Sequence, residues 1–135
     1  MLLSQASKYG IRAAVFLAGH QGEEPVLGRD IAMALEVPAP FLAKILQDLS
    51  RRGLLLSFKG RGGGFLLARP AASILLREIV EALEGPHFGS GCLLGLPACS
   101  AEDPCPLHDD WTGIRDEILQ LLSSRTLEQA LVEKN

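Results

Sequence analysis

The residues best suited to chemistry in this sequence are three cysteines that lie close together. Cys92, Cys99 and Cys105 are the only cysteines of the 135-residue chain, and the intervals between them hold six and five residues. The segment 91–108 around them contains glycine, proline and serine, which predict an irregular loop. Such a loop can bring thiolates onto one soft metal centre, and His108 lies three residues after the last thiol. The pattern predicts a metal site with Cys92, Cys99, Cys105 and His108 as ligands.

Spacing alone leaves other interpretations of these thiols open. They could be inert surface cysteines, or two could pair and leave the third over, since an odd number cannot close a complete disulfide framework. Three cysteines with one histidine is also a common zinc set, although zinc ligands usually come in close Cys-x2-4-Cys pairs. A thiol redox enzyme is disfavoured because the chain has no Cys-x-x-Cys and no Lys or Arg near the thiols. We therefore expect a metal site, with the zinc and inert-thiol alternatives left open by the spacing, and no enzyme.

The first half of the chain must supply the elements that use such a site. Apolar residues at helical spacing predict a first helix that starts at Ser4 or Ser7 and runs to about Ala18. A short extended piece at 26–27 and a second helix from Gly28 follow. A third helix is expected from about Ala39 to Arg52, with Pro40 in its first turn and Gly53 just beyond its end.

The second and third helices have the pattern of a helix-turn-helix. A tight connector at 37–40 joins them, and the third helix is expected to bury four apolar residues and to leave a polar, basic face outward. In this arrangement the second helix of the pair enters the major groove of DNA. The buried set is Leu42, Ile45, Leu46 and Leu49; the outward set is Lys44, Gln47, Arg51 and Arg52.

A basic, glycine-rich hairpin is expected next. Two apolar runs, 54–58 and 65–67, flank a tip at 59–64 that contains four glycines with Lys59 and Arg61. Glycines let the backbone approach phosphates or the minor groove, so the tip is predicted to be a DNA-binding wing. A nucleotide-binding loop is disfavoured because no Lys-Ser or Lys-Thr follows the glycines and a strand, rather than a helix, comes next.

The second half is predicted to be helical on either side of the cysteine loop. A fourth helix over about 76–83 ends at Gly85, and a long helix resumes from about Leu107. This long helix carries an apolar stripe that has to be buried, either on its own domain or on a second subunit, and we expect a homodimer. A last short helix runs through Leu131. The stripe is Trp111, Ile114, Ile118, Leu121 and Leu122.

Charge and hydropathy patterns bound the location and the partners. Residues 1–70 carry nine Lys and Arg against five acids, whereas residues 71–135 carry four against eleven. A basic half joined to an acidic half is typical of a polyanion-binding module with a sensing or dimerising segment. The start of the chain is a poor secretory signal, and no apolar run is long enough to cross a membrane. We expect a cytoplasmic protein with reduced thiols.

With these parts in order, the sequence strongly resembles the Rrf-type winged-helix transcriptional regulators, which include the IscR-like and NsrR-like iron–sulfur proteins. The resemblance covers nearly the whole chain. It is carried by the segments 7–13 (SKYGIRA), 41–49 (FLAKILQDL), 60–68 (GRGGGFLLA) and 79–85 (IVEALEG) and by the places of the three cysteines.

The resemblance implies a homodimer that binds a near-palindromic operator, with an iron–sulfur cluster, either two-iron or four-iron, in the loop before the dimerisation helix. Two departures from the family pattern stand out. The first cysteine interval holds six residues instead of the more usual five. Some relatives use an acidic ligand in helix one where this chain has Lys8, and because an ammonium cannot ligate iron, His108 is favoured as the fourth ligand.

These inferences define a mostly α fold with a small β-hairpin wing. We expect a winged helix-turn-helix unit at 1–85, a cluster-binding loop at 86–106, and a dimerisation helix and tail at 107–135. The protein is predicted to be a cluster-controlled regulator that binds double-stranded DNA and a second copy of itself, with no small-molecule substrate and no membrane partner. The alternative is a cluster-free regulator whose cysteines sense oxidants directly or bind zinc. The DNA-binding residues are expected to be Pro40, Phe41, Lys44, Gln47, Arg51, Lys59, Arg61, Gly62 and Gly63.

Overall fold

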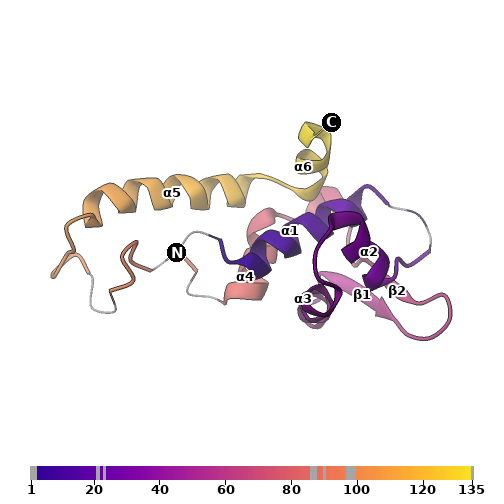
Figure 1. Cartoon of the computed structure of the whole chain (residues 1–135). Helices are drawn as coiled ribbons and strands as arrows, with labels where there is room; N and C mark the ends of the chain where they lie inside the picture. Colours follow the sequence, from indigo (N-terminus) through magenta and orange to yellow (C-terminus); the bar gives the residue numbers. More distant parts are fainter. Residues whose placement is uncertain are drawn as a thin grey trace.

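A group of short helices carries a β-hairpin on one side and a long helix, α5, that extends away from it (Figure 1). The computed structural model describes residues 3–20, 22, 24–85, 88–89, 91–96 and 100–134, with the backbone alone for 132–134. The elements in chain order are α1 (Gln5–Ala18), α2 (Gly28–Leu35), α3 (Ala39–Arg51), β1 (Leu55–Phe58), β2 (Gly64–Leu67), the 3-10 turn η1 (Ala71–Ser73), α4 (Leu76–Glu84), α5 (His108–Ser124) and α6 (Leu127–Lys134).

The helix ends follow local sequence signals. Ser4 caps α1 by accepting a hydrogen bond from the Ser7 amide at 3.1 Å. Pro40 lies in the first turn of α3, where its missing N–H costs nothing. Gly53 follows that helix with φ 80°, a left-handed conformation that glycine adopts without a steric penalty. The expected boundaries of the first four helices are therefore confirmed to within a residue or two.

The hydrophobic core lies between α1, α2, α3, α4 and α6. The apolar face of α3 is fully enclosed, as the helical spacing predicted, and the side chains that α1, α2, α4 and α6 contribute to the same core come from well-separated parts of the sequence. Burial of these faces fixes which side of α3 remains outside. The largest core side chains are Leu17, Ile31, Leu42, Leu46, Leu49, Ile74, Ile79 and Leu127.

The α1 and α4 helices cross at small residues. A Cβ added at Gly10 would lie 2.5 Å from the Cδ1 of Leu83, so a larger residue there would require the Leu83 side chain to move. One turn earlier, Ser7 is fully buried and donates its hydroxyl to the Oε2 of Glu84 at 2.7 Å. Glu84 is the last residue of α4, so this bond joins the start of α1 to the point where the chain leaves for the cysteine loop.

The hairpin is antiparallel, with Leu55 opposite Leu67 and Phe58 opposite Gly64. Val26 forms an isolated antiparallel β-bridge to the hairpin, because its N–H and C=O pair with the backbone of Phe65 at 3.0 and 2.8 Å. The extended piece expected at 26–27 is thus confirmed as a partner of the hairpin. Gly64 is required there, since a Cβ on it would lie 2.4 Å from the backbone of Val26.

The C-terminal helix returns to the helix-turn-helix unit. The Leu127 amide donates to the Ile74 carbonyl at 2.9 Å, the Leu76 amide donates to Arg125, and the Leu127 side chain is completely buried in the core. Thr126 and Gln129 form reciprocal capping bonds at the start of α6. The segment expected at 107–135 is therefore divided, with α5 outside the core and α6 inside it. No helix in the described part of the chain is long and apolar enough to cross a membrane.

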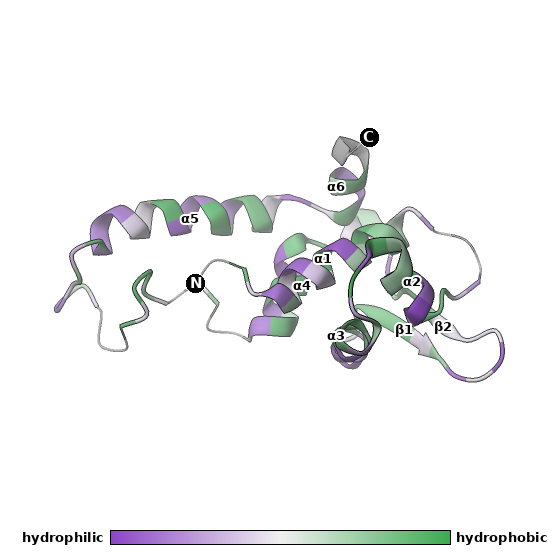
Figure 2. Ribbon diagram, in the orientation of Figure 1, coloured by the Kyte–Doolittle hydropathy of each residue, from purple (hydrophilic) through white to green (hydrophobic). Residues whose placement is uncertain are grey.

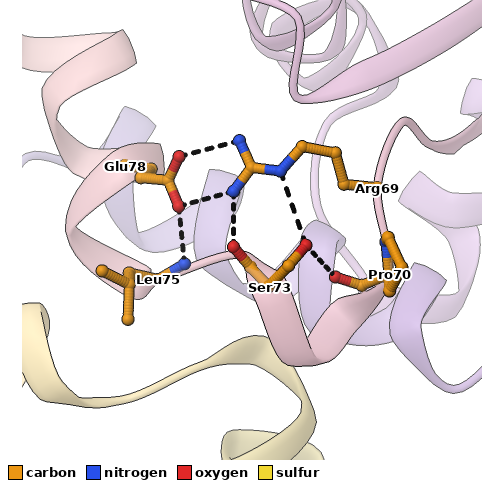
Figure 3. Close-up of polar contacts among 5 residues, drawn as sticks. All are labelled: Arg69, Pro70, Ser73, Leu75 and Glu78. Carbon is orange, nitrogen blue, oxygen red and sulfur yellow. Dashed lines mark hydrogen bonds and ion pairs between the residues drawn. The ribbon is translucent and has the colours of Figure 1, made fainter.

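An arginine–glutamate pair fixes the hairpin to α4 (Figure 3). The Arg69 guanidinium donates to both carboxylate oxygens of Glu78, at 2.9 and 2.8 Å, and also bonds the Ser73 carbonyl. The same carboxylate accepts the Leu75 amide at 2.9 Å and so caps α4. The hydrogen bond from Arg69 lowers the pKa of Glu78, and the same bond raises the pKa of Arg69.

We predict that Glu78→Gln destabilises the protein at neutral pH and has no effect in acid. The folded-state pKa of Glu78 lies below its ordinary value of 4.5, so its contribution is full above pH 4.5 and is lost as pH falls through the lower folded value. Because the pair is partly exposed, we expect a difference of only about 0.5–1 kcal/mol. Urea unfolding of both proteins across pH 3–7 measures it, and a difference that stays constant down to pH 3 would contradict this assignment.

Candidate nucleic-acid interface and cysteine loop

The outer face of α3 has the character expected of a recognition helix. Its apolar face is buried, and the five α3 residues predicted to touch DNA are all exposed: Pro40, Phe41, Lys44, Gln47 and Arg51. Arg51 pairs with Asp48 one turn earlier, so part of its charge is already neutralised. Lys44 and Gln47 therefore provide the charged group and the amide on α3 that are best placed to contact DNA.

Phe41 is anchored to α1 as well as exposed. Its ring meets Tyr9 edge to face, with centroids 5.5 Å apart and planes at 79°. The guanidinium of Arg12 lies over the Tyr9 ring and donates to the Leu35 carbonyl at 2.8 Å. This chain of contacts holds the start of α3 against α1 and the end of α2. Phe41 thus helps to set the position of α3, a role that its place in the sequence did not reveal.

A cleft separates the start of α2 and the outer face of α3 from the hairpin tip. Its volume is 820 Å³, and its walls include the cations Arg29 and Arg61 together with Gln47. Arg29 was missed in the sequence because it is distant from the wing along the chain. Gly28, the residue before it, lies against α3 and the hairpin, since a Cβ at Gly28 would lie 3.3 Å from the Cδ1 of Leu46 and 3.6 Å from the Phe65 ring.

Glycines at the hairpin tip leave its backbone uncovered by side chains. Gly60 and Gly62 have φ values of 82° and 77°, and a Cβ at either position would have no neighbour within 4 Å, so a substituted residue would be strained without meeting other atoms. Lys59, Arg61 and Gly62 are exposed, as expected of a wing. Gly63 is buried instead, because its amide bonds the Gly60 carbonyl and a Cβ there would strike Phe58. Its role is to shape the tip.

Two of the three cysteines meet near the start of α5. The sulfurs of Cys92 and Cys105 are 3.6 Å apart, well beyond a disulfide bond of about 2.05 Å. This is the separation of a thiol–thiol hydrogen bond, and it is also close to the about 3.8 Å expected for two thiolates bound at about 2.3 Å to one tetrahedral metal. Cys99 lies outside the described residues. The fold thus brings together thiols that are separated by twelve residues of loop.

His108 begins α5 and is half-buried. Its amide donates to the Cys105 carbonyl at 3.1 Å, so the last cysteine and the histidine share one turn. Across the described part of the chain, no three His, Cys, Asp or Glu side chains form a set able to hold one metal ion. The side chains available nevertheless have the soft donor atoms that iron–sulfur clusters use. Two thiols lie next to each other, and the same loop carries a third cysteine.

The apolar stripe of α5 has both buried and exposed members. Trp111 and Leu122 are each 5% exposed, and the indole N–H of Trp111 donates to the Gly91 carbonyl at 3.0 Å. Ile114 and Leu121 are 54% and 51% exposed, and Ile118 is intermediate. Figure 2 shows apolar positions along this outlying helix. Packing within the chain therefore buries Trp111 and Leu122, covers Ile118 in part, and leaves Ile114 and Leu121 exposed.

The fold and the basic cleft define a winged helix-turn-helix protein of the DNA-binding class. A family model described as "Iron-dependent Transcriptional regulator" (Rrf2) matches residues 3–133. The chain belongs to the Rrf2 family and is a transcriptional regulator. It is 32% identical to an HTH-type transcriptional regulator of Aquifex aeolicus over 133 residues, which are 97% of this chain and 92% of that one. It is 31% identical to the regulator IscR of Photorhabdus laumondii, over 96% of this chain and 78% of that one.

Solved structures have the same fold. The structure of CymR, the global cysteine regulator of B. subtilis, matches with a TM-score of 0.81 and 28% identity over 100% of this chain and 99% of that one. T. potens IscR matches with a TM-score of 0.77 and 28% identity over 100% of this chain and 89% of that one. The predicted family and the predicted winged-helix fold are therefore confirmed.

We predict that residues of the cleft differ in what they contribute to DNA binding. Arg61→Ala and Arg29→Ala should weaken binding to specific and to non-specific DNA by similar factors, because each variant loses one phosphate contact. Each should also reduce the slope of log affinity against log salt concentration by about one. Gln47→Ala should instead relax sequence preference, by about 1–3 kcal/mol at one base position. Titrations of fragments from the gene's own upstream region at several salt concentrations measure both effects.

Arg77→Ala serves as the charge-matched control, because Arg77 lies on α4 and is absent from the cleft walls; since Arg77 also donates to Ser123 of α5 at 3.0 Å, thermal unfolding and the oligomeric state of this variant are checked first. It should leave affinity and salt slope unchanged. Equal losses for Arg77→Ala and Arg61→Ala would show that net charge, rather than the cleft, determines binding.

Proposed function

We propose that this protein is a homodimeric, cytoplasmic regulator whose operator binding is controlled by an iron–sulfur cluster in the cysteine loop. The observation that carries the proposal is the 3.6 Å approach of the Cys92 and Cys105 sulfurs beside α5. A thiol pair at metal-sharing distance stands next to the helix whose exposed centre suits a second subunit. A signal received at the loop would thus act directly on the element that relates the two DNA-reading units.

The DNA-binding part of the proposal rests on shape and charge. An α-helix enters the major groove with its polar residues toward the base edges, and α3 presents Lys44 and Gln47 on its exposed face. Arg29, Lys59 and Arg61 lie around the same cleft or at the hairpin tip, where they would neutralise phosphates. A dimer would place two such units on the half-sites of a near-palindrome.

The dimer is proposed to form through the centre of α5. Ile114 and Leu121 are exposed apolar side chains that the chain's own core leaves uncovered, and Ile118 lies between them in the sequence. Trp111 and Leu122, which the sequence grouped with them, support α5 within the chain instead. Exposed apolar surface of this kind is typical of a protein–protein contact.

In the proposed holo protein, Cys92, Cys99 and Cys105 would hold the cluster, with His108 as the fourth ligand. A cluster of this type supplies redox chemistry and reactivity toward oxygen and nitric oxide, while the protein fixes the loop. The His108 amide at the start of α5 donates to the Cys105 carbonyl just before it, and Gly91, next to Cys92, accepts from Trp111 on the same helix, so Cys92, Cys105 and His108 are all linked to α5. The loop is therefore suited to transmit an order–disorder change to the dimer.

We expect anaerobically reconstituted protein to be coloured and to contain stoichiometric iron and sulfide. Cys105→Ser should lose most of both, because it removes one member of the 3.6 Å pair, whereas Ser100→Ala in the same loop should keep them. Iron and sulfide analysis with a visible spectrum measures the outcome. Wild-type protein that stays colourless and binds zinc under these conditions would contradict the cluster and favour a zinc site.

A cluster-free thiol sensor is the second candidate, and the same distance favours it. Two sulfurs 3.6 Å apart need to approach by only about 1.5 Å to form a disulfide. A structurally similar protein, CymR of Staphylococcus aureus, has been solved in a form described as oxidized, at 24% identity and a TM-score of 0.74. That likeness supports the fold alone, so the thiol distance is what carries the alternative.

We predict that diamide links Cys92 to Cys105 in the cluster-free protein. The two thiols lose two protons and two electrons to form the disulfide, and diamide is reduced to its hydrazine. Peptide mapping under non-reducing conditions identifies the pair, and Cys92→Ser should abolish it. If the sensor is cluster-free, this oxidation must change DNA affinity; unchanged affinity in the fully linked protein would remove the alternative.

A further inference from the structure

The wall of the DNA cleft contains only part of the outer face of α3. Four exposed residues of this helix line the cleft, whereas Phe41, Lys44 and Arg51 are exposed elsewhere on it. Among the described residues, no acidic side chain lines the cleft, and its two charged residues are Arg29 and Arg61. The four α3 residues are Ala39, Pro40, Ala43 and Gln47.

The side chains on this wall differ in what they can recognise. Gln47 carries an amide that can pair with a base edge, and its part in sequence preference belongs to the function proposed above. Ala39 and Ala43 each carry only a methyl group, which neither donates nor accepts a hydrogen bond. Ala39, Ala43 and Gln47 follow one another at intervals of one helical turn, so they share one face of α3. This face therefore joins an apolar surface to a hydrogen-bonding group.

The major groove of DNA has one apolar feature that suits such a face. Thymine presents its C5-methyl group there, whereas the other three bases present hydrogen-bonding groups alone. Arg29 and Arg61 would hold phosphates of the strand that passes through the cleft, and the alanine wall would then face the groove beside that strand. Side chains as short as alanine also let the backbone of α3 come close to the base edges.

We propose that Ala43 is a specificity-determining residue, whose methyl group packs against the C5-methyl group of a thymine in each half-site of the operator. The proposal rests on the DNA-binding part of the proposed function and assigns one base to one side chain. Gln47 lies about 6 Å further along α3, which corresponds to about two base pairs. Because glutamine pairs well with adenine, the half-site should hold A·T pairs at both positions. Ala39 would extend the apolar contact toward the start of the helix.

The test removes single methyl groups from the operator. Selection from random duplexes gives the preferred half-site of the purified full-length protein, in the state of the cysteine loop that binds DNA more tightly. Each thymine is then replaced by uracil, which loses the C5-methyl group and keeps the base pairing. Burial of one such group contributes up to about fourfold in affinity, so one thymine position should lose that factor in each half-site, and about fifteenfold when both half-sites are changed.

Variants assign that thymine to Ala43. Ala43→Gly should bind the thymine and uracil operators equally at this position and keep the wild-type response at every other thymine. Ala34→Gly makes the same change at an exposed residue of α2 outside the cleft walls, and it should discriminate like wild type. Lys44→Ala, next to Ala43, should weaken binding to all DNA and keep the ratio of thymine to uracil affinity.

Ala43→Leu gives a second measurement that does not depend on a glycine within a helix, since leucine is a good helix former. Its longer side chain should keep α3 away from the base edges, so operator affinity should fall by about tenfold while the salt slope stays unchanged. Circular dichroism and thermal unfolding check that each variant is folded.

Three results would overturn the proposal: no effect of uracil at any thymine, wild-type discrimination in Ala43→Gly, or wild-type operator affinity in Ala43→Leu. A protein that selects no sequence at all would overturn the DNA-reading function together with this inference. Clear sequence selection without any methyl effect would remove only the role of Ala43.

Discussion

The close crossing of α1 and α4 is the contact on which both functional parts of this structure depend. Gly10 allows the two helices to approach, and the fully buried Ser7 gives its hydroxyl to Glu84 at the end of α4. On one side of the crossing, α1 supports α3 and, through Tyr9, the position of Phe41. On the other side, the chain leaves α4 for the cysteine loop. A larger residue at Gly10 would have to displace the end of the Leu83 side chain at this crossing.

The remaining contacts hold together a DNA-reading unit made of α1–α4, the hairpin and α6, which we call the reader, and leave the cysteine loop and α5 outside its core. Arg69 and Glu78 hold the hairpin to α4, Val26 pairs with Phe65, and α6 closes the core from the far end of the chain. The loop and α5 are connected to this reader at two ends, since α5 leads directly into the buried Leu127. Buried side chains hold α5 near both of its ends, Trp111 close to His108 and Leu122 before α6. In the function proposed above, the loop would change the relation between two subunits without unfolding the reader.

Periodicity and turn chemistry were sufficient to predict the reader. The apolar spacing of α3 indicated both its buried face and the exposed Lys44 and Gln47, and the glycines of the wing marked its tip. What the sequence could not reveal were contacts made by packing between distant segments: the place of Arg29 in the cleft, the return of α6 to the core, and the Arg69–Glu78 pair. The stripe on α5 shows the same limit. Spacing identified it as apolar, but only the fold shows that Trp111 and Leu122 are used within the chain while Ile114 and Leu121 remain outside. In the cysteine loop the structure brings Cys92 and Cys105 together, and the ligand roles of Cys92, Cys99, Cys105 and His108 all remain predictions.

Control of the reader by the state of the cysteine loop is the central proposal. Its most direct test is the affinity of one anaerobic, coloured preparation for its operator, measured before and after the colour is bleached with nitric oxide, with Cys105→Ser measured alongside. We predict that operator affinity changes by about tenfold or more on bleaching, that non-specific affinity does not, and that Cys105→Ser matches the bleached protein from the start. Equal operator affinity in the coloured and bleached states would contradict control by the loop.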